Sequence, residues 1–315
     1  MIDIVMATYN GEKHIKTQVL SLMSQTFQNW HLHIYDDCST DNSVEIIREL
    51  CAIDNRISLH LNEKNIGCAL TFLSGIRNTE SDFVVLCDQD DIWVDSKLET
   101  LLSSISHQDI SIPRLCFSRG YQYDDKSKII TGRINMNVPV NLADFLLLNG
   151  GIQGCSMIFN HSLVQLIKQY DSLVAMHDHY ISALAFMFGE IELLDCDLML
   201  YRKHSNNVTN SVHGSKLFKY LSFYKNNNYL IDEVHFLAIK SLYAATKQDL
   251  SADKKKLLNE YLSLPYKNKL GLLRSILKNK FTVKNSVILA LIMAIIFNKY
   301  GLNNNSKLVS WEANQ

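Results

Sequence analysis

The first ninety residues alternate short apolar runs with segments of helical periodicity. The apolar runs are rich in β-branched and aromatic residues, which predicts buried strands over 2–7, 30–35, 57–61 and 83–86. Between them, apolar residues recur three and four positions apart, which predicts helices over 13–24, 44–51 and 69–76. Strands that alternate with helices predict right-handed βαβ units and a mostly parallel sheet flanked by helices, an α/β fold.

The pattern after residue 110 is mixed. Two apolar runs on either side of Asp124-Asp125, over 115–123 and 128–133, predict an antiparallel pair. Further segments predict helices over 142–148, 162–170 and 177–188, and strands over 157–159, 191–194 and 199–201. We place the end of a first domain, 1–210, in the polar stretch around residue 210. A helical region is predicted for 211–315, beyond this boundary.

Polar side chains follow three of the predicted strands directly. These segments are Thr8-Tyr9-Asn10, Asp36-Asp37 and Asp88-Gln89-Asp90. In open α/β sheets, ligands bind at the carboxyl ends of the strands. Three such segments at one sheet edge predict a nucleotide pocket.

The acids at 88, 90 and 91 are crowded into four positions behind a buried strand. Carboxylates this close raise one another's pKa unless a cation joins them. A hard divalent ion, Mg²⁺ or Mn²⁺, is the natural partner, and such ions commonly bridge carboxylates to phosphates. The alternative is an acidic turn ahead of a helix that begins near Lys97, with Asp95 or Ser96 as its cap.

The composition argues against nucleic-acid binding, a disulfide-stabilised fold and a membrane-spanning protein. A net charge of −1 gives no overall basic surface for nucleic acid. Seven scattered cysteines, none in a C-x-x-C spacing, suit reduced cytosolic thiols better than disulfides or zinc. The chain enters a strand at once, with Asp3 where a secretory signal would carry basic residues, and no apolar run is long enough for a membrane span.

Several motifs occur together and in order. They are Ala7-Thr8-Tyr9-Asn10-Gly11, Ser24-Gln25-Thr26-Phe27, Asp36-Asp37-Cys38-Ser39-Thr40-Asp41, Asn65-Ile66-Gly67 and Asp88-Gln89-Asp90-Asp91-Ile92-Trp93. With them, residues 2 to about 208 resemble the family 2 glycosyltransferases, an inverting, nucleotide-sugar-dependent class with the GT-A fold. The last motif, with His177-Asp178-His179-Tyr180 and Tyr201-Arg202-Lys203-His204, is similar to the rhamnosyltransferase-like branch that builds surface polysaccharides such as O-antigen. One departure is Cys38, where glycine is common in the family.

The resemblance implies roles for the acids. Asp37 corresponds to the carboxylate that accepts a hydrogen bond from N3–H of uracil or thymine, and the alternative is a helix cap. Asp90 corresponds to the metal ligand and Asp88 to a residue near the ribose or sugar, with Asp88 and His204 as further candidates for the metal site. Asp91 either orients the donor sugar or caps the next helix.

Asp178 is our candidate for the general base. An inverting transfer requires a carboxylate that takes a proton from the acceptor hydroxyl, and the family places this acid at the start of a helix. The alternative is that Asp178 is only an N-cap. His177 and His179 flank it, but no third ligand stands at zinc spacing in the sequence, so we do not favour zinc.

Other residues are candidate donor contacts. Tyr9 is expected to pack on the base, unless it is a core tyrosine at the strand end. Thr8 and Asn10 are expected to shape the loop first and contact the ligand second, and Asn65 lies in a loop beside the nucleotide. Arg202 suits phosphate oxygens, although a surface ion pair is an equal alternative.

The tail carries its own signal. Residues 264–299 contain seven lysines and arginines and no acid, with the apolar run 287–297 at the end. This combination predicts peripheral attachment to an anionic membrane surface, against the alternatives of a docking helix or a dimer contact.

These features together predict an inverting, metal-dependent glycosyltransferase at the inner face of the bacterial cell membrane. The expected donor is a dTDP- or UDP-sugar, rhamnose above all on the resemblance, and the expected acceptor is an undecaprenyl-diphosphate-linked saccharide. A nucleotidyltransferase is one alternative, although it requires a Gly-rich basic loop after the first strand that this chain lacks. A non-catalytic nucleotide-sugar-binding protein is the other.

Overall fold

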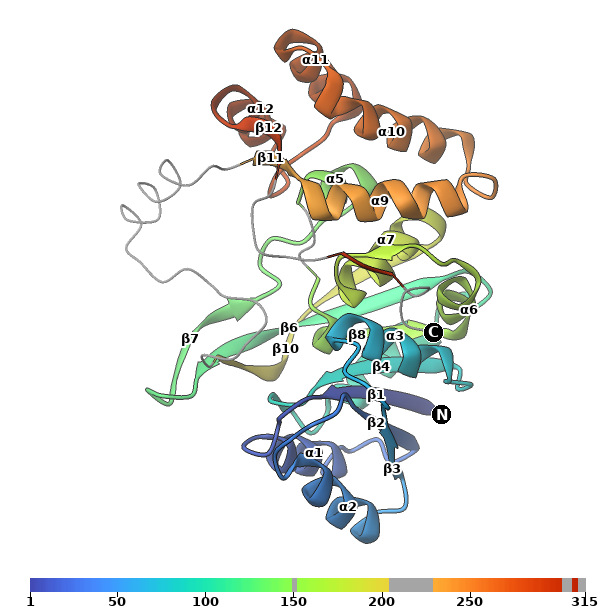
Figure 1. The fold of residues 1–315 in the computed structure, drawn as a ribbon, viewed down its shortest axis with the longest axis vertical. Helices are drawn as coiled ribbons and strands as arrows, with labels where there is room; N and C mark the ends of the chain where they lie inside the picture. The colour runs from blue at the N-terminus through green and yellow to red at the C-terminus, as the bar shows by residue number, and fades with distance from the viewer. Residues whose placement is uncertain (149–151, 204–228, 302–307, 311–315) are drawn as a thin grey trace.

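A single large sheet organises the molecule. The computed structural model describes residues 1–148, 152–203, 229–301 and 308–310. Nine of the described strands form this sheet, in the order β3-β2-β1-β4-β8-β6-β10-β5, with β7 paired to β6 (Figure 1). Their bounds are β1 Ile2–Thr8, β2 Trp30–Asp36, β3 Ile57–Leu61, β4 Phe83–Asp88, β5 Ile92–Trp93, β6 Arg114–Asp124, β7 Ile129–Ile134, β8 Met157–Asn160 and β10 Glu190–Lys203.

The strands of the first half pair in parallel. β1 lies between β2 and β4, and its end Thr8 is in register with Asp36 while Ala7 is in register with Asp88. This register brings the polar segments that follow β1, β2 and β4 to one edge. The residues of β1 and β4 are mostly apolar because both faces of these strands are buried.

Helices cover both faces of the sheet. One apolar core joins the first face to α1 (Ile15–Met23), α2 (Ser43–Ile53) and α4 (Lys97–Ser106). A second core joins the opposite face to α3 (Cys68–Arg77), α5 (Leu142–Leu148), α6 (His161–Gln169) and α7 (His177–Phe188). The layered, mostly parallel α/β architecture predicted from the sequence is therefore confirmed.

Strand β10 is longer than the sequence predicted. The pattern indicated two strands, over 191–194 and 199–201, whereas one strand runs from Glu190 to Lys203. Its pairing with β6 shifts register between Leu194 and Asp197 and again before Leu200. These irregularities interrupt the alternation of apolar and polar residues, so the pattern breaks where the strand continues.

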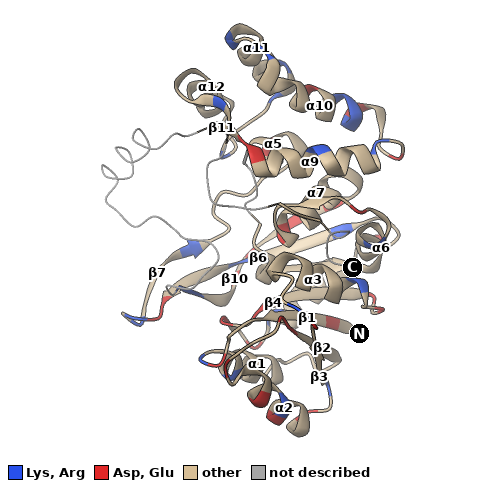
Figure 2. Cartoon of the chain, in the orientation of Figure 1, with Lys and Arg blue, Asp and Glu red and all other residues tan. Residues whose placement is uncertain are grey.

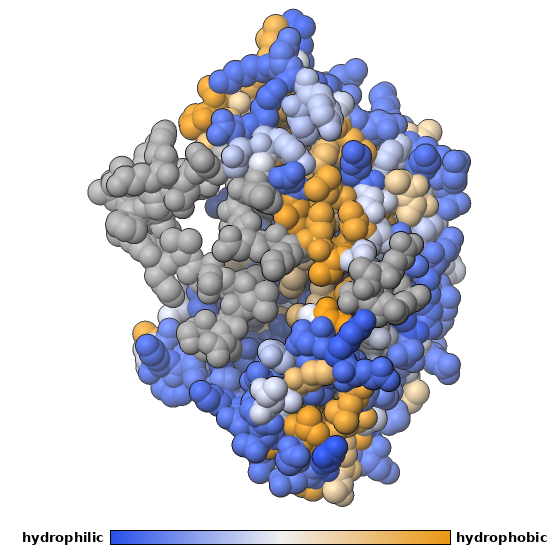
Figure 3. Space-filling view, viewed as in Figure 1, coloured by the Kyte–Doolittle hydropathy of each residue, from blue (hydrophilic) through white to orange (hydrophobic). Residues whose placement is uncertain are grey.

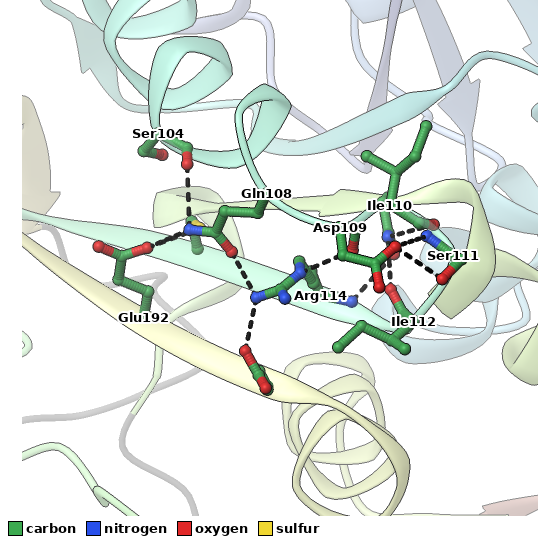
Figure 4. A network of polar contacts seen from close by, with 11 residues as sticks. Ser104, Gln108, Asp109, Ile110, Ser111, Ile112, Arg114 and Glu192 are labelled. Carbon is green, nitrogen blue, oxygen red and sulfur yellow. Dashed lines mark hydrogen bonds and ion pairs between the residues drawn. The ribbon is translucent and has the colours of Figure 1, made fainter.

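A polar network ties the end of α4 to the sheet (Figure 4). The guanidinium of Arg114 donates to Gln108 Oε1 and to Glu190 Oε2, both at 2.6 Å, and to the carbonyl of Asp109 at 2.7 Å. Gln108 in turn donates to the carbonyl of Ser104 at 3.1 Å. The network fixes the connection from α4 into β6 and its neighbour β10.

The C-terminal region packs on the second core. It consists of β11 (Tyr229–Asp232), α9 (Glu233–Thr246), α10 (Ala252–Ser263), α11 (Lys269–Asn279), α12 (Val287–Ile296), β12 (Asn298–Gly301) and β13 (Val309–Ser310). Phe236, Tyr261 and Phe281 share one apolar cluster with Phe145 and Tyr180. The helical character predicted for this region is confirmed, while the predicted boundary near residue 210 lies outside the described residues.

The described part of the chain contains no candidate transmembrane helix. None of its helices combines the length and the apolar character that a bilayer span requires.

Candidate active site

A cavity of about 560 Å³ opens at the carboxyl ends of β1, β2 and β4. Its walls come from the loop after β1, the loop before α3, the segment after β4 and the start of α7. Eight of the predicted residues line it: Thr8, Tyr9, Asn10, Asp37, Asn65, Asp88, Asp90 and Asp178. The sheet edge that the sequence indicated is thus the site of the cavity.

Four acids from distant parts of the chain converge here. Asp37, Asp88, Asp90 and Asp178 all line the cavity. Their joint field is visible at Cys68, on the first turn of α3: burial raises the pKa of this thiol, and the negative charges of all four acids raise it further. A site with this charge favours a cation and a ligand that brings one.

Asp37 is held in place by the loop before α3. Its carboxylate accepts hydrogen bonds from Asn62 Nδ2 at 2.8 Å, from the N–H of Ile66 at 2.9 Å and from the N–H of Gly67 at 2.8 Å. A carboxylate has about four acceptor positions, so one remains for a ligand donor. Asn65, whose Nδ2 donates to the carbonyl of Asp37 at 2.9 Å, braces the same turn. Asp37 therefore does not cap α2, which begins after Asn42.

Gln89 latches the loop after β1 to the loop after β4. Its Oε1 accepts from Thr8 Oγ1 at 2.6 Å and from the N–H of Tyr9 at 3.0 Å, and its Nε2 donates to the carbonyl of Tyr9 at 3.3 Å. Tyr9 is 48% exposed, so it is not the core tyrosine of the alternative interpretation. Asn10 has the loop-forming role that we expected, because its φ is 51° and its Oδ1 accepts from the N–H of Thr40 at 2.8 Å.

The acids at the end of β4 and just after it raise one another's pKa. Desolvation raises the pKa of Asp88 to about 7, with contributions from the charges of Asp90 and Asp178. Beneath them lies the fully buried Lys97, whose Nζ donates to the carbonyl of Cys155 at 2.6 Å. Burial lowers the pKa of Lys97 to about 8. One buried ammonium does not balance the carboxyls at 88, 90 and 91. Among the described residues, Asp88, Asp91 and Cys155 bring potential ligand atoms within 4.8 Å of one another.

Asp91 and Arg202 lie behind the cavity wall. Asp91 has no exposed surface, and its Oδ1 accepts from the N–H of Arg202 at 3.1 Å, so it neither lines the cavity nor caps α4. Burial and the charges of Asp90 and Asp88 raise its pKa well above the usual range. Arg202 Nε donates to the carbonyl of Asp90 at 2.7 Å and its guanidinium pairs with Asp125. Both residues thus support the acidic loop from below; a direct contact of either with the donor, which we expected, finds no support in this arrangement.

Asp178 stands in the first turn of α7 and faces the cavity. The N-cap position is Met176, so Asp178 is not the cap of the helix. His177 beside it also lines the cavity, is 4% exposed, and stacks on Phe72 with ring centroids 4.1 Å apart. Gly154 makes room for this ring, because a Cβ there would lie 2.7 Å from His177 Nε2.

The two histidines of the His-x-His segment lie in different surroundings. His179 points away from the cavity into the core, where it stacks on Phe145 and meets His235 edge-on. Burial, together with the charge of His235, lowers its pKa well below 6.5. Within the described ranges, no cluster of three potential ligands includes His177 or His179.

Sequence reasoning missed part of the lining. The cavity wall also includes Lys13, His14, Cys68, Thr71, Phe72, Gln89, Gln153, Met176 and Tyr201. Gln89 carried a signal, since it stands between the two acids of the Asp-x-Asp. His204, a candidate metal ligand, lies outside the described residues.

With this geometry established, comparison with known proteins decides the family. The family model described as "Glycosyl transferase family 2" matches residues 3–166. The chain belongs to glycosyl transferase family 2. It is accordingly a glycosyltransferase, as the motifs indicated.

Relatives in this family include bacterial enzymes. An uncharacterized glycosyltransferase of Haemophilus influenzae is 35% identical over 103 residues, 33% of this chain and 41% of the relative, so that match spans less than half of the relative's length. The Escherichia coli enzyme named UDP-Glc:alpha-D-GlcNAc-diphosphoundecaprenol beta-1,3-glucosyltransferase WfgD is 26% identical over 213 residues, 67% of this chain and 80% of the relative.

Solved structures support the fold. The Staphylococcus aureus TarS fragment 1–349, crystallised with UDP-GlcNAc, superposes with a TM-score of 0.58 and 17% identity. The match covers 88% of this chain and 80% of that one. At this identity the likeness establishes the GT-A fold of this family 2 member and nothing about its substrate.

Proposed function

We propose that this family 2 member is an inverting, metal-dependent glycosyltransferase. It moves a sugar from a dTDP- or UDP-sugar to a hydroxyl of a saccharide carried on undecaprenyl diphosphate, in the synthesis of a bacterial surface polysaccharide. The observation that carries this proposal is the convergence of Asp37, Asp88, Asp90 and Asp178 on one cavity.

The donor half of the cavity is assigned to the nucleotide. Asp37 accepts the N3–H of the uracil or thymine base at its remaining acceptor position, and Tyr9 packs its half-exposed ring on that base. Asp90 and Asp88 would hold Mg²⁺ or Mn²⁺, and the bound ion would offset the negative charge that develops on the departing nucleoside diphosphate. Asp91, Lys97 and the backbone contact of Arg202 keep the acidic loop in place.

Asp178 serves as the general base. It takes the proton of the acceptor hydroxyl as that oxygen attacks the anomeric carbon on the face opposite the diphosphate, which inverts the configuration. Its place on the first turn of α7, across the cavity from the β4 loop, leaves the space between them for the sugar.

Two further observations bear on which sugar is transferred and which acceptor receives it. The rhamnosyltransferase-like form of the motifs favours dTDP-rhamnose and an O-antigen pathway, whereas the name of the Escherichia coli relative WfgD favours a glucosyl donor. That same name supports an undecaprenyl-diphosphate acceptor. Such an acceptor places the enzyme at the inner face of the cell membrane, in the cytoplasm.

One experiment tests the proposal against both alternatives. The purified protein is incubated with UDP- and dTDP-sugars and a short-chain lipid-diphosphate saccharide, with Mn²⁺ or Mg²⁺, with and without chelator. A glycosyltransferase releases nucleoside diphosphate and extends the acceptor. In a parallel incubation with a nucleoside triphosphate and a sugar phosphate, release of inorganic pyrophosphate would indicate a nucleotidyltransferase. Donor binding without turnover on any acceptor would indicate a binding protein.

A further inference from the structure

Helix α12 turns its largest side chains outward. All ten residues of Val287–Ile296 are apolar, and the buried ones are the small Ala290 and Ala294. Ile288, Ile292, Ile295 and Ile296 are 71%, 45%, 52% and 48% exposed. Spacings of three, four and eight positions put these four on one helix face. An ordinary core-facing helix does the reverse, so this face is arranged to meet something apolar.

The neighbouring helix adds to the same end of the molecule. α11 packs against α12 and exposes Leu270 and Leu277, each 57% accessible and two turns apart. Figure 3 shows hydrophobic residues at the upper end of the molecule, where Figure 1 places these two helices.

The segment that contains these two helices is also basic. Between residues 264 and 299 stand seven lysines and arginines and no acid, whereas the whole chain has a net charge of −1. Five of the seven are exposed, namely Lys269, Arg274, Lys278, Lys280 and Lys284. In Figure 2 the ribbon of α11 carries basic and no acidic positions. The ribbon of α12 carries no charged residue. A surface that combines bulky apolar groups with an excess of positive charge is complementary to anionic lipid head groups over acyl chains.

We propose that the exposed faces of α11 and α12 form a docking surface for an anionic lipid bilayer. A ten-residue helix is about 15 Å long, half the hydrocarbon thickness, so α12 lies in the interface with its isoleucines among the acyl chains. The exposed lysines then meet the head groups. This surface goes beyond the catalytic cavity, and it rests on the proposed function only in that a lipid-linked acceptor gives docking a use.

Vesicle flotation tests the docking surface. Full-length protein is mixed with phosphatidylcholine vesicles that contain either no or about 30% phosphatidylglycerol, without donor or acceptor. Binding to the anionic vesicles is expected, with a fall as salt is raised. Ile292→Glu and Ile295→Glu are each expected to weaken partition about tenfold. Lys278→Glu and Lys284→Glu are each expected to weaken it at least fivefold.

Matched controls keep the test independent of folding and catalysis. Ile53→Glu, at an isoleucine 72% exposed on α2, has to leave partition unchanged. The α12 substitutions have to leave the rate of transfer to a water-soluble acceptor unchanged. If the protein binds vesicles but shows no transferase activity, the docking surface is still supported and only the proposed function fails. The proposal is overturned if the wild type stays unbound, if the α12 variants bind equally well, or if Ile292→Glu converts a dimer into a monomer and so shows a second copy to be the occupant.

Discussion

Asp37 accepts a hydrogen bond of 2.8 Å from the backbone N–H of Gly67, the N-cap residue of α3. Gly67 has φ of 84°, a left-handed conformation that favours glycine. The contact joins the end of β2 to the loop that forms one wall of the cavity. A single carboxylate thus shapes the cavity wall and, in the function proposed above, offers an acceptor to the base of the donor.

The first prediction separates these two roles by changing the ligand. UDP with a methyl group on N3 lacks the donor that Asp37 would accept, and it leaves the loop around Gly67 untouched. We expect this analogue to bind at least tenfold more weakly than UDP, because a buried charged acceptor loses its partner. Titration calorimetry measures both affinities.

The Asp37→Asn variant supplies the control. Its side chain has one acceptor oxygen in place of two, so it loosens the loop as well as the base contact. It should therefore weaken UDP binding and remove the preference for UDP over the N3-methyl analogue. Equal affinity of the wild type for both ligands would refute the base contact.

A second prediction concerns Asp178. Asp178→Asn keeps the shape of the first turn of α7 and removes the base. We expect kcat to fall about 10³-fold, with the Kd of the nucleotide-sugar changed less than twofold, since the base acts on the acceptor. Initial rates and donor titrations provide the two numbers.

Asp171→Asn is a suitable comparison for Asp178. Asp171 is 52% exposed and pairs with Arg77 outside the cavity, so its loss should leave kcat unaffected. A wild-type rate in Asp178→Asn would rule out the base assignment while leaving the donor pocket intact.

The sequence predicts those features of the fold and the site that depend on residues close together in the chain. The apolar runs of β1 to β4 and the acids that directly follow β2 and β4 are visible as short local patterns. The acids meet at one sheet edge because the neighbouring strands pair in parallel register. The latch of Gln89 on Thr8 spans 81 positions, and the contact of Arg202 with Asp91 spans 111, so no pattern along the chain carries either. Asp91 is an aspartate like its neighbours Asp88 and Asp90, and only the fold shows that it is fully buried.

A third prediction follows from the space beside His177. The Cβ of Gly154→Ala would meet His177 Nε2 at 2.7 Å, and the ring is confined by Phe72 on its other side. Displacing the ring disturbs the cavity next to Asp178, so we expect kcat/KM to drop about tenfold. Because the clash needs the ring, Gly154→Ala should have little further effect in a His177→Ala background. Additive losses in the double variant would show that Gly154 acts independently of His177.

A fourth prediction concerns the departure at Cys38. This residue has φ of 65°, which costs a side-chain-bearing residue about 1–2 kcal/mol, and its Sγ contacts the carbonyl of Asn62 at 3.2 Å. Cys38→Gly and Cys38→Ala both delete that contact, but only glycine relieves the backbone. The glycine variant should be the more stable of the two by about 1 kcal/mol in urea unfolding. Equal stabilities would mean that this turn carries no strain.

The last prediction uses a buried acid far from the cavity. Asp3 is 4% exposed, and its carboxylate accepts from the N–H groups of Glu80 at 3.2 Å and Ser81 at 3.1 Å and lies 3.4 Å from His33 Nε2. Burial raises the pKa of Asp3, but these hydrogen bonds to His33 and Ser81 favour the charged form more strongly and lower it from 3.8 to about 2. The charged form therefore stabilises the folded state above pH 3.8, and this contribution is lost as the pH falls through 2.

Asp3→Asn removes that contribution at nearly constant shape. We expect the free energy of unfolding to fall by about 2 kcal/mol at pH 7 and by about a third of that amount at pH 2.5, because the wild-type carboxyl is then partly protonated in the folded state. Urea unfolding at both pH values measures the difference. Asp82→Asn, at a position 73% exposed, should change stability by less than about 0.5 kcal/mol throughout. A loss for Asp3→Asn that stays constant from pH 7 to 2.5 would point to packing rather than charge, because only the charge is titrated away in acid.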